Sequence, residues 1–176
     1  EELTDQFPLI YDVVNNFGIP IYEQAGFEAD DVIGTISKEI IQKEEGLDVV
    51  IVTGDKDILQ LVEKKRIQVA MLGRGVSDFS LYDDKAVIEK FGFTPEKIID
   101  YKAFMGDPSD NIPGVRGVGK KTATQLLIDV GTVDDVYKHI QKFQDTEECK
   151  IKASVVKKLV AGEKEAHMSR ELERII

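Results

Sequence analysis

The feature that most constrains the fold is one uninterrupted apolar run that ends in an acidic turn. Residues 49–53 read Val-Val-Ile-Val-Thr, and the β-branched side chains that dominate this run favour a strand. Because polar residues do not alternate with the apolar ones, we predict a strand buried on both faces, as in a parallel sheet. Gly54, Asp55, Lys56 and Asp57 follow at once. Ligands of open α/β sheets bind beyond the carboxyl ends of the strands, so this turn is a candidate site.

Helices and strands alternate in the first half of the chain, whereas the second half is helical throughout. Two stretches with apolar side chains at helical spacing precede the strand of residues 49–53. Residues 67–72 form a second predicted strand, and a glycine turn leads from it to a short edge strand. We therefore predict an α/β fold, with a mostly parallel sheet and its helices in residues 1–82 and an all-helical lobe in residues 83–176.

The net charge of −10 at first argues against a nucleic-acid partner, because DNA-binding surfaces usually carry a basic excess. That argument fails if many of the acids are gathered in a site that holds divalent cations. The single cysteine, Cys149, forms neither an internal disulfide nor a cysteine-based zinc site. No apolar run approaches the roughly 20 residues that cross a bilayer, and the N-terminus lacks the pattern of a signal peptide. We expect a cytoplasmic protein with no membrane partner.

Carboxylates gather in three short segments where the predicted elements place loops or helix starts. Each segment alone has an ordinary structural explanation: acids that complement a helix dipole, a capped turn after a strand, and an Asx-type turn. For the first cluster the helix-dipole explanation is preferred, and for the second the two interpretations are balanced. The seven carboxylates are Glu28, Asp30, Asp31, Asp55, Asp57, Asp107 and Asp110.

The three clusters together suggest a metal site. Two carboxylates about 4 Å apart repel by roughly 4 kcal/mol at an effective dielectric constant of 20, so several would converge only around bound cations. Carboxylate and water ligands without histidine or cysteine suit Mg²⁺ or Mn²⁺ rather than zinc. Two such ions, roughly 3.5–4 Å apart, can activate water and neutralise the leaving oxygen when a phosphodiester is hydrolysed. We therefore expect two or more ions.

A glycine-rich segment follows the third cluster and opens a predicted helix near residue 120. Glycines let a backbone approach a phosphate closely, and the free N–H groups at a helix start favour an anion. The neighbouring basic side chains would bind a nucleic-acid backbone without reading its sequence. A nucleotide-binding loop is the rival interpretation, but the spacing fits neither the P-loop nor the G-x-G-x-x-G pattern. The candidate DNA-binding residues are Gly114, Arg116, Gly117, Gly119, Lys120, Lys121 and Thr122.

Three segments resemble the 5′-nuclease domains of bacterial DNA polymerase I, which are members of the flap-endonuclease family. The matching segments are residues 27–31, 52–57 and 105–123, and the similarity extends over essentially the whole chain. The resemblance implies a PIN/Rossmann-like core followed by a helical lobe with a helix-hairpin-helix element. By this resemblance, five carboxylates match the core ligands that act in catalysis through bound metal: Glu28, Asp30, Asp55, Asp57 and Asp110. Asp31 and Asp107 match additional carboxylates of the bacterial members.

The same resemblance implies what the domain acts on. Family members hydrolyse phosphodiester bonds near the 5′ end or at the base of a 5′ flap, in primer removal and in repair. The implied partners are DNA with a 5′ flap or a nick, RNA-primed DNA, and a polymerase domain linked in the same polypeptide. The implied cofactors are two or more Mg²⁺ or Mn²⁺ ions, with K⁺ held by backbone carbonyls of the hairpin. We expect a monomer near the bacterial nucleoid.

The chain departs from the family pattern at its N-terminus. Family members begin with a strand that carries a metal-binding Asp, followed by another Asp and a basic helical arch, and none of these precedes Glu1. Residues 1–17 form a predicted amphipathic helix that resembles the one descending from the arch. Since the missing strand would be central to the sheet, we expect an exposed strand edge and an incomplete metal site.

Two alternatives stay open at this point. In the first alternative, the chain as given holds duplex DNA through its glycine-rich segment without cutting it. In the other it would be a phosphotransferase that uses Asp55 and Asp57 in the manner of aspartyl-phosphate enzymes. The second alternative leaves the glycine hairpin and the other five carboxylates unexplained.

Overall fold

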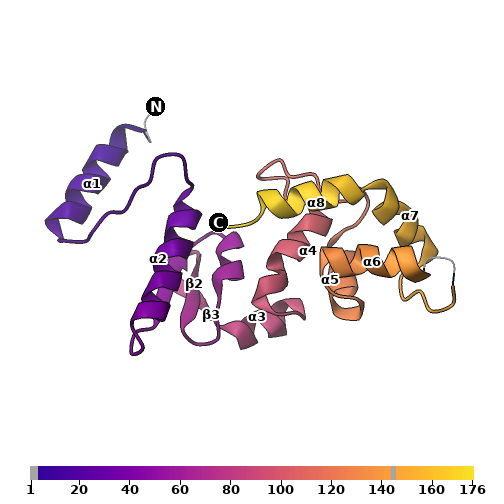
Figure 1. The fold of residues 1–176 in the computed structure, drawn as a ribbon. Helices are drawn as coiled ribbons and strands as arrows, with labels where there is room; N and C mark the ends of the chain where they lie inside the picture. Colours follow the sequence, from indigo (N-terminus) through magenta and orange to yellow (C-terminus); the bar gives the residue numbers. More distant parts are fainter. Residues whose placement is uncertain (1–3, 144–145) are drawn as a thin grey trace.

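The protein folds into an α/β lobe and a helical lobe that lie side by side. The computed structural model describes residues 4–143 and 146–176, apart from the side chains of residues 75–77. Helix α4 (Ile98–Met105) lies where the two lobes meet and packs against elements of both (Figure 1). None of the helices in the described ranges is long and apolar enough to span a membrane.

The sheet confirms the α/β prediction, although its strands are not all parallel. Within the described residues it has the order β1 (Val49–Thr53), β2 (Ile67–Gly73) and β3 (Gly75–Tyr82). Strand β1 pairs parallel to β2, and β2 pairs antiparallel to β3, so the sheet is mixed. The crossover from β1 to β2 runs through the 3₁₀ helix η2 (Asp57–Leu61), whose side chains Ile58 and Leu59 are fully buried.

The prediction that the strand at residues 49–53 is buried on both faces is wrong for this structure. Ile51 is buried, but Val50 and Val52 on the opposite face are 52% and 63% exposed. The reason is the position of β1 in the sheet: among the described residues it pairs only with β2, so it is an edge strand with one uncovered face. The exposed strand edge that we expected is present.

The helices of the α/β lobe differ in how they pack. Helix α2 (Ala29–Lys43) contacts β1 and buries Gly34 and Ser37. The predicted N-terminal helix is confirmed as a 3₁₀ turn, η1 (Thr4–Gln6), and α1 (Phe7–Asn16), but α1 buries no residue. Figure 1 shows α1 apart from the rest of the molecule, joined to α2 by an extended segment. Its apolar face, with Leu9 and Val13, is exposed.

The second half of the chain is all helical, as predicted. Phe104 of α4 and Leu127 and Leu159 of the surrounding helices are fully buried and form the centre of this lobe. Asp83 caps α3, because its side chain accepts a hydrogen bond from the Ala86 N–H at 2.9 Å. The remaining helices are α3 (Asp84–Phe91), η3 (Pro95–Lys97), α5 (Lys120–Asp129), α6 (Val133–Phe143), α7 (Ala153–Ala161) and α8 (Glu163–Leu172).

The C-terminal segment returns from the helical lobe to the α/β lobe. The Gln60 side chain donates to the Glu173 carbonyl at 3.0 Å and accepts from the Ile175 N–H at 3.1 Å. The Ile176 N–H donates to Asp31 Oδ1 at 2.8 Å. These bonds tie the end of the helical lobe to η2 and to the first turn of α2, and Figure 1 shows the C-terminus beside α2.

Candidate metal centre and nucleic-acid hairpin

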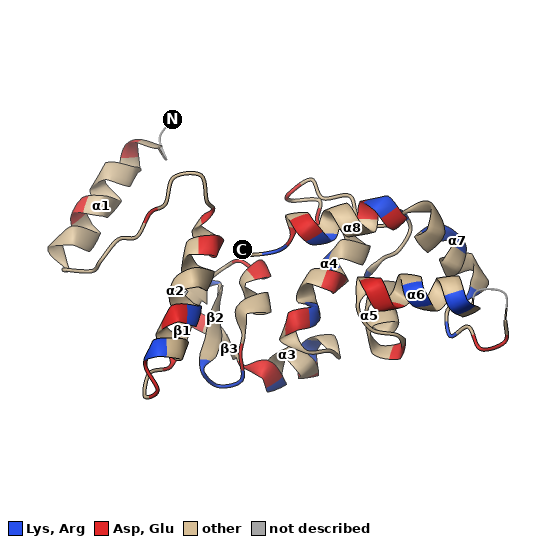
Figure 2. Ribbon diagram, in the orientation of Figure 1, with Lys and Arg blue, Asp and Glu red and all other residues tan. Residues whose placement is uncertain are grey.

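The three acidic clusters, far apart in sequence, meet at one place in the fold. Figure 2 shows acidic residues at the N-terminal end of α2 and on the loop that follows α4. One pocket of about 360 Å³ is lined by six of the seven predicted carboxylates: Glu28, Asp30, Asp31, Asp55, Asp57 and Asp110. The seventh, Asp107, lines an adjoining pocket of about 640 Å³ together with Asp55, Asp57 and Asp110. The structure therefore brings all seven side chains to one region.

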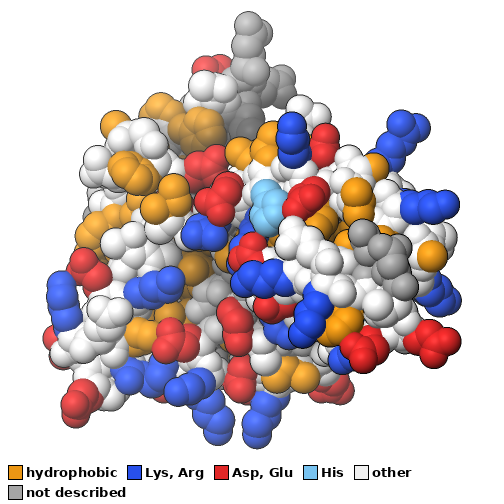
Figure 3. Space-filling model, turned by 45° about the vertical axis from the view of Figure 1, so that its right-hand side comes forward, with side chains coloured by type: hydrophobic (Ala, Val, Ile, Leu, Met, Phe, Trp, Pro, Cys, Tyr) orange, Lys and Arg blue, Asp and Glu red, His pale blue; other side chains and the backbone are white. Residues whose placement is uncertain are grey.

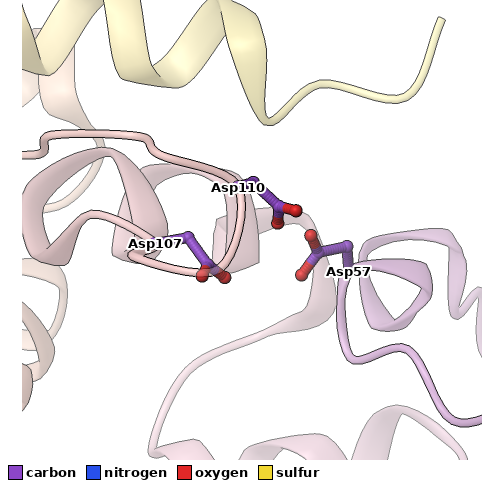
Figure 4. A group of neighbouring side chains, drawn as sticks. All are labelled: Asp57, Asp107 and Asp110. Carbon is purple, nitrogen blue, oxygen red and sulfur yellow. The ribbon is translucent and has the colours of Figure 1, made fainter.

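The tightest group in this region can hold a cation. Asp57, Asp107 and Asp110 each offer a carboxylate oxygen, and these oxygens lie within 4.8 Å of one another. Figure 4 shows the three side chains directed toward a common space, Asp57 from the start of η2 and the two others from the loop after α4. An all-carboxylate group of this kind suits a hard divalent ion such as Mg²⁺.

A tight turn after β1 places the second cluster. The Asp55 N–H donates to Thr53 Oγ1 at 3.0 Å, and the Asp57 N–H donates to Asp55 Oδ1 at 2.9 Å. These bonds within the turn direct both acids toward the carboxyl end of the parallel strand, where the sheet rule places ligands. Burial raises the pKa of Asp57, and the nearby Asp55 charge raises it further, against the opposing effect of Lys102.

The first cluster divides into a helix cap and side chains that face the pocket. Asp31 Oδ2 accepts from the Glu28 N–H at 3.2 Å and forms a capping box with Glu28. Its other oxygen accepts from the Ile176 N–H, so both oxygens of Asp31 are already bonded. Asp30 is different, because burial raises its pKa and the charges of Asp55 and Asp57 raise it further. A bound cation would relieve the repulsion at Asp30.

Lys102 is a member of the site that the sequence analysis missed. Its ammonium group contacts Asp57, lies 2.7 Å from Asp107 Oδ2 and lies 3.1 Å from Glu173 Oε2. Burial lowers the pKa of Lys102, but its hydrogen bonds to Asp107 and Asp57 outweigh burial, so the pKa lies above the ordinary value of a lysine. Lys102 is therefore a fixed positive charge within the acidic region.

The loop that carries Asp107 and Asp110 is closed at its base, where the backbones of Gly106 and Gly114 lie in close contact. The Asp107 and Ile112 backbones bond to each other in both directions, at 3.0 and 2.8 Å. At the base of this loop Gly114, with φ +58°, lies against Gly106, and a Cβ on Gly114 would lie 2.2 Å from the Gly106 nitrogen. The Asx-type turn that we considered is also present, since the Ser109 N–H donates to Asp107 Oδ1 at 2.9 Å.

We refer to the glycine-rich segment of residues 114–122 as the hairpin. Its three glycines have different surroundings. Gly114 is buried against Gly106, and its N–H donates to Ser169 Oγ of α8 at 3.1 Å. Gly117 has φ +81°, and the Lys158 side chain, whose Nζ donates to the Gly117 carbonyl at 2.8 Å, lies across its open side. Gly119 has an ordinary φ of −105°, and a Cβ there would meet nothing within 4 Å. Packing among the described residues explains the first two glycines, whereas Gly119 leaves an open approach to the start of α5.

The basic residues of the hairpin are exposed, and one of them, Lys120, lies close to the acids. Arg116, Lys120 and Lys121 are exposed, while Val115 and Val118 between them are buried and anchor the hairpin. Lys120 lines the same 640 Å³ pocket as the acids of the second and third clusters. Figure 3 shows basic and acidic side chains interspersed on the face in view, with no broad basic surface there.

Sequence models of two linked domains match the chain from end to end. The first, described as "5'-3' exonuclease, N-terminal resolvase-like domain", matches residues 1–92, and the second, "5'-3' exonuclease, C-terminal SAM fold", matches residues 93–176. The chain belongs to the 5′-3′ exonuclease family. The two family models meet after residue 92, in the turn that follows α3. Our division of this exonuclease chain after residue 82 stays a prediction.

Relatives of this exonuclease chain are DNA polymerases I of bacteria. It is 41% identical to the DNA polymerase I of Bacillus caldotenax over 180 residues and 41% identical to that of Bacillus subtilis over 175 residues. Each alignment covers 99% of the chain but only 20% and 19% of the relative. The chain thus spans about a fifth of the length of the relatives it matches.

Solved structures confirm the fold of the exonuclease chain. A T5 5′-exonuclease with bound divalent metal ions (zinc) matches with a TM-score of 0.75 at 24% identity, over 97% of this chain and 56% of that one. The catalytic core of Rad2 in complex with DNA substrate matches with a TM-score of 0.62 at 21% identity, over 96% and 55% of the two chains. At these identities the likeness establishes the fold alone.

Proposed function

We propose that the chain forms part of a 5′-nuclease domain that hydrolyses phosphodiester bonds in DNA with the help of Mg²⁺ or Mn²⁺. The observation that carries this proposal is the convergence of three separate acidic clusters on one pocket, beside the exposed start of α5. The structural alternatives explain single members, such as Asp31 in its capping box, but no structural need brings all seven acids together. Family membership and the metal-bound T5 relative support the same conclusion.

The residues present fit divalent ions. Asp57, Asp107 and Asp110 would hold one ion, and Glu28, Asp30 and Asp55 line the space for a second. Bound ions would supply an activated water and neutralise the charge that develops on the leaving oxygen. The turn after β1 and the closed loop after α4 would hold these carboxylates close enough to share ions.

The hairpin is proposed to hold the DNA backbone. Gly119 leaves room for a phosphate at the start of α5, and Arg116, Lys120 and Lys121 add positive charge around it. Gly114, Gly117 and Thr122 belong to the same segment, and K⁺ held by its carbonyls would strengthen the anion site. Lys120 joins the two functions, because it lies between the hairpin and the acids.

The substrate and the cellular role of the domain are part of the same proposal. We propose a 5′ flap or nicked duplex, including RNA-primed DNA, as substrate, with roles in primer removal during replication and in repair. The relatives are DNA polymerases I of which the matched part is about a fifth, so we propose a polymerase domain in the same polypeptide. The expected state is a monomer in the bacterial cytoplasm, near the nucleoid.

A cleavage assay on a 5′-labelled flap duplex tests the proposal. The chain is assayed alone and with the N-terminal segment implied by the family resemblance, each with Mg²⁺ and with a chelator. We expect Mg²⁺-dependent cleavage by the extended protein, which Asp55→Asn abolishes. Glu39→Gln, at an exposed site on α2 outside the pocket, removes the same charge and is expected to leave cleavage unchanged.

Two results would contradict the proposal. Cleavage that survives Asp55→Asn would remove the second cluster from the active site. Duplex binding without cleavage by the extended protein at any Mg²⁺ concentration would leave only a DNA-binding module. A stable phospho-aspartate at Asp55 or Asp57 would instead indicate a phosphotransferase.

A further inference from the structure

A buried glutamate, Glu173, is among the residues that line the 360 Å³ pocket of the six carboxylates, which we call the acidic pocket. Glu173 follows α8 and is only 5% exposed, and among the described residues its Oε1 has no hydrogen-bond partner, while its Oε2 contacts only the ammonium group of Lys102. Its backbone is held on both sides, since its N–H donates to the Ser169 carbonyl and its own carbonyl accepts from Gln60. These bonds hold the backbone of Glu173 in place, and Glu173 is one of the residues that line the 360 Å³ pocket with the acids.

The charged group nearest to this glutamate is Lys102. Glu173 Oε2 lies 3.1 Å from Lys102 Nζ, and the same ammonium group contacts Asp57 and lies 2.7 Å from Asp107. The side chains of Lys102 and Glu173 are 9% and 1% exposed, so water screens this contact weakly. Three carboxylates thus share one positive charge, and two of them belong to the group of Asp57, Asp107 and Asp110.

We propose that Glu173 is a positioning residue of the acidic pocket, which shares the charge of Lys102 with Asp57 and Asp107 and so weakens the competition of that ammonium group with a cation for their oxygens. This inference rests on the proposed function. Without Glu173, the whole charge of Lys102 would act on Asp57 and Asp107, and it would compete with a divalent ion for their oxygens. With Glu173, part of that charge is balanced by a carboxylate outside the group of Asp57, Asp107 and Asp110.

Direct measurement of Mn²⁺ binding to the chain by calorimetry tests the inference. Glu173→Gln keeps the shape of the side chain and is expected to weaken Mn²⁺ binding on the order of fivefold, because the charge of Lys102 then acts on Asp57 and Asp107 alone and competes more strongly with the ion. Glu171→Gln is the matched control, because Glu171 lies two residues away and its side chain is 68% exposed. That control is expected to change the affinity less than twofold. Equal affinities of the wild type and Glu173→Gln would overturn the inference.

A double-mutant cycle shows whether Glu173 acts through Lys102. In the Lys102→Met background, Glu173→Gln is expected to change Mn²⁺ affinity less than twofold, because the competing ammonium group is gone. Thermal unfolding in a chelator adds a readout that needs no metal. Lys102→Met is expected to lower the melting temperature, and adding Glu173→Gln is expected to raise it again, because a buried carboxylate without its partner is relieved of its charge.

The outcomes separate this inference from the proposed function. If neither the chain nor the protein extended by the N-terminal segment binds Mn²⁺, the proposed function fails, and the inference about Glu173 fails with it. If the wild type binds Mn²⁺ and the double variant unfolds at the same temperature as Lys102→Met, the coupling of Glu173 to Lys102 is overturned while the metal site stands.

Discussion

Gly114→Ala is the substitution that the structure predicts to be most damaging at an apparently simple position. Alanine would have to adopt φ +58°, which costs about 1 kcal/mol or more. Its Cβ would lie 2.2 Å from the Gly106 nitrogen and 2.6 Å from the Gly106 Cα, both of them backbone atoms that rotamer changes cannot move away. The loop after α4 would have to open, at a further cost of about 1–3 kcal/mol for overpacking. The buried bond from the Gly114 N–H to Ser169 would be strained as well.

Together these effects predict a loss of about 3–5 kcal/mol in the free energy of unfolding, out of the roughly 5–15 kcal/mol typical of a domain. Urea unfolding followed by circular dichroism measures this loss. Gly119→Ala is the matched control, because φ is −105° there and a Cβ meets nothing within 4 Å. We expect Gly119→Ala to keep its stability within about 0.5 kcal/mol and to bind duplex DNA more weakly. A Gly114→Ala protein within about 1 kcal/mol of the wild type would refute the reasoning from the close contact of the two glycine backbones.

Two further predictions concern charge. Lys120→Ala plus Lys121→Ala is expected to weaken duplex affinity and to lower the slope of log affinity against log salt by about 2, whereas Lys64→Ala plus Lys65→Ala leaves that slope unchanged; an unaltered slope in the first variant would remove the hairpin from the interface. Lys102 and Ser109 lower the pKa of Asp107 from 3.8 to about 2, so its contribution to stability is present above pH 3.8 and lost as the pH falls toward 2. Over this pH range the free energy of unfolding, measured by urea titration, is expected to fall by about 1 kcal/mol more for the wild type than for Asp107→Asn. The difference is no larger because water screens part of the Asp107 charge. Parallel pH curves of the two proteins would contradict the ion pair.

The elements of the fold were predictable because their signals are local. The apolar run of residues 49–53 and the helical spacing after residue 83 depend only on neighbours in sequence, and both are confirmed. The exposure of Val50 and Val52 could not be predicted in the same way. Whether a strand is covered on both faces depends on how many partners it has, and β1 has one among the described residues.

The candidate site could be predicted in part for a similar reason. Acids such as Asp55 and Asp57 follow a strand directly, and the rule for the carboxyl ends of strands locates them without a structure. Lys102 carries no such signal, because a lysine in a helix is usually read as a solvated side chain. The bond from Ile176 to Asp31 joins residues 145 apart, and only the packing of the two lobes reveals it.

The acidic pocket belongs to neither lobe alone. Asp55 and Asp57 come from the α/β lobe, whereas Lys102 and Asp110 come from α4 and the loop that follows it. That loop ends at Gly114, where the hairpin begins, so the close approach of the Gly106 and Gly114 backbones positions both the third cluster and the segment that we propose to bind DNA. The proposed function is compatible with a net charge of −10, because the acids are gathered where bound ions would neutralise them and the exposed Lys120 of the hairpin lies next to them.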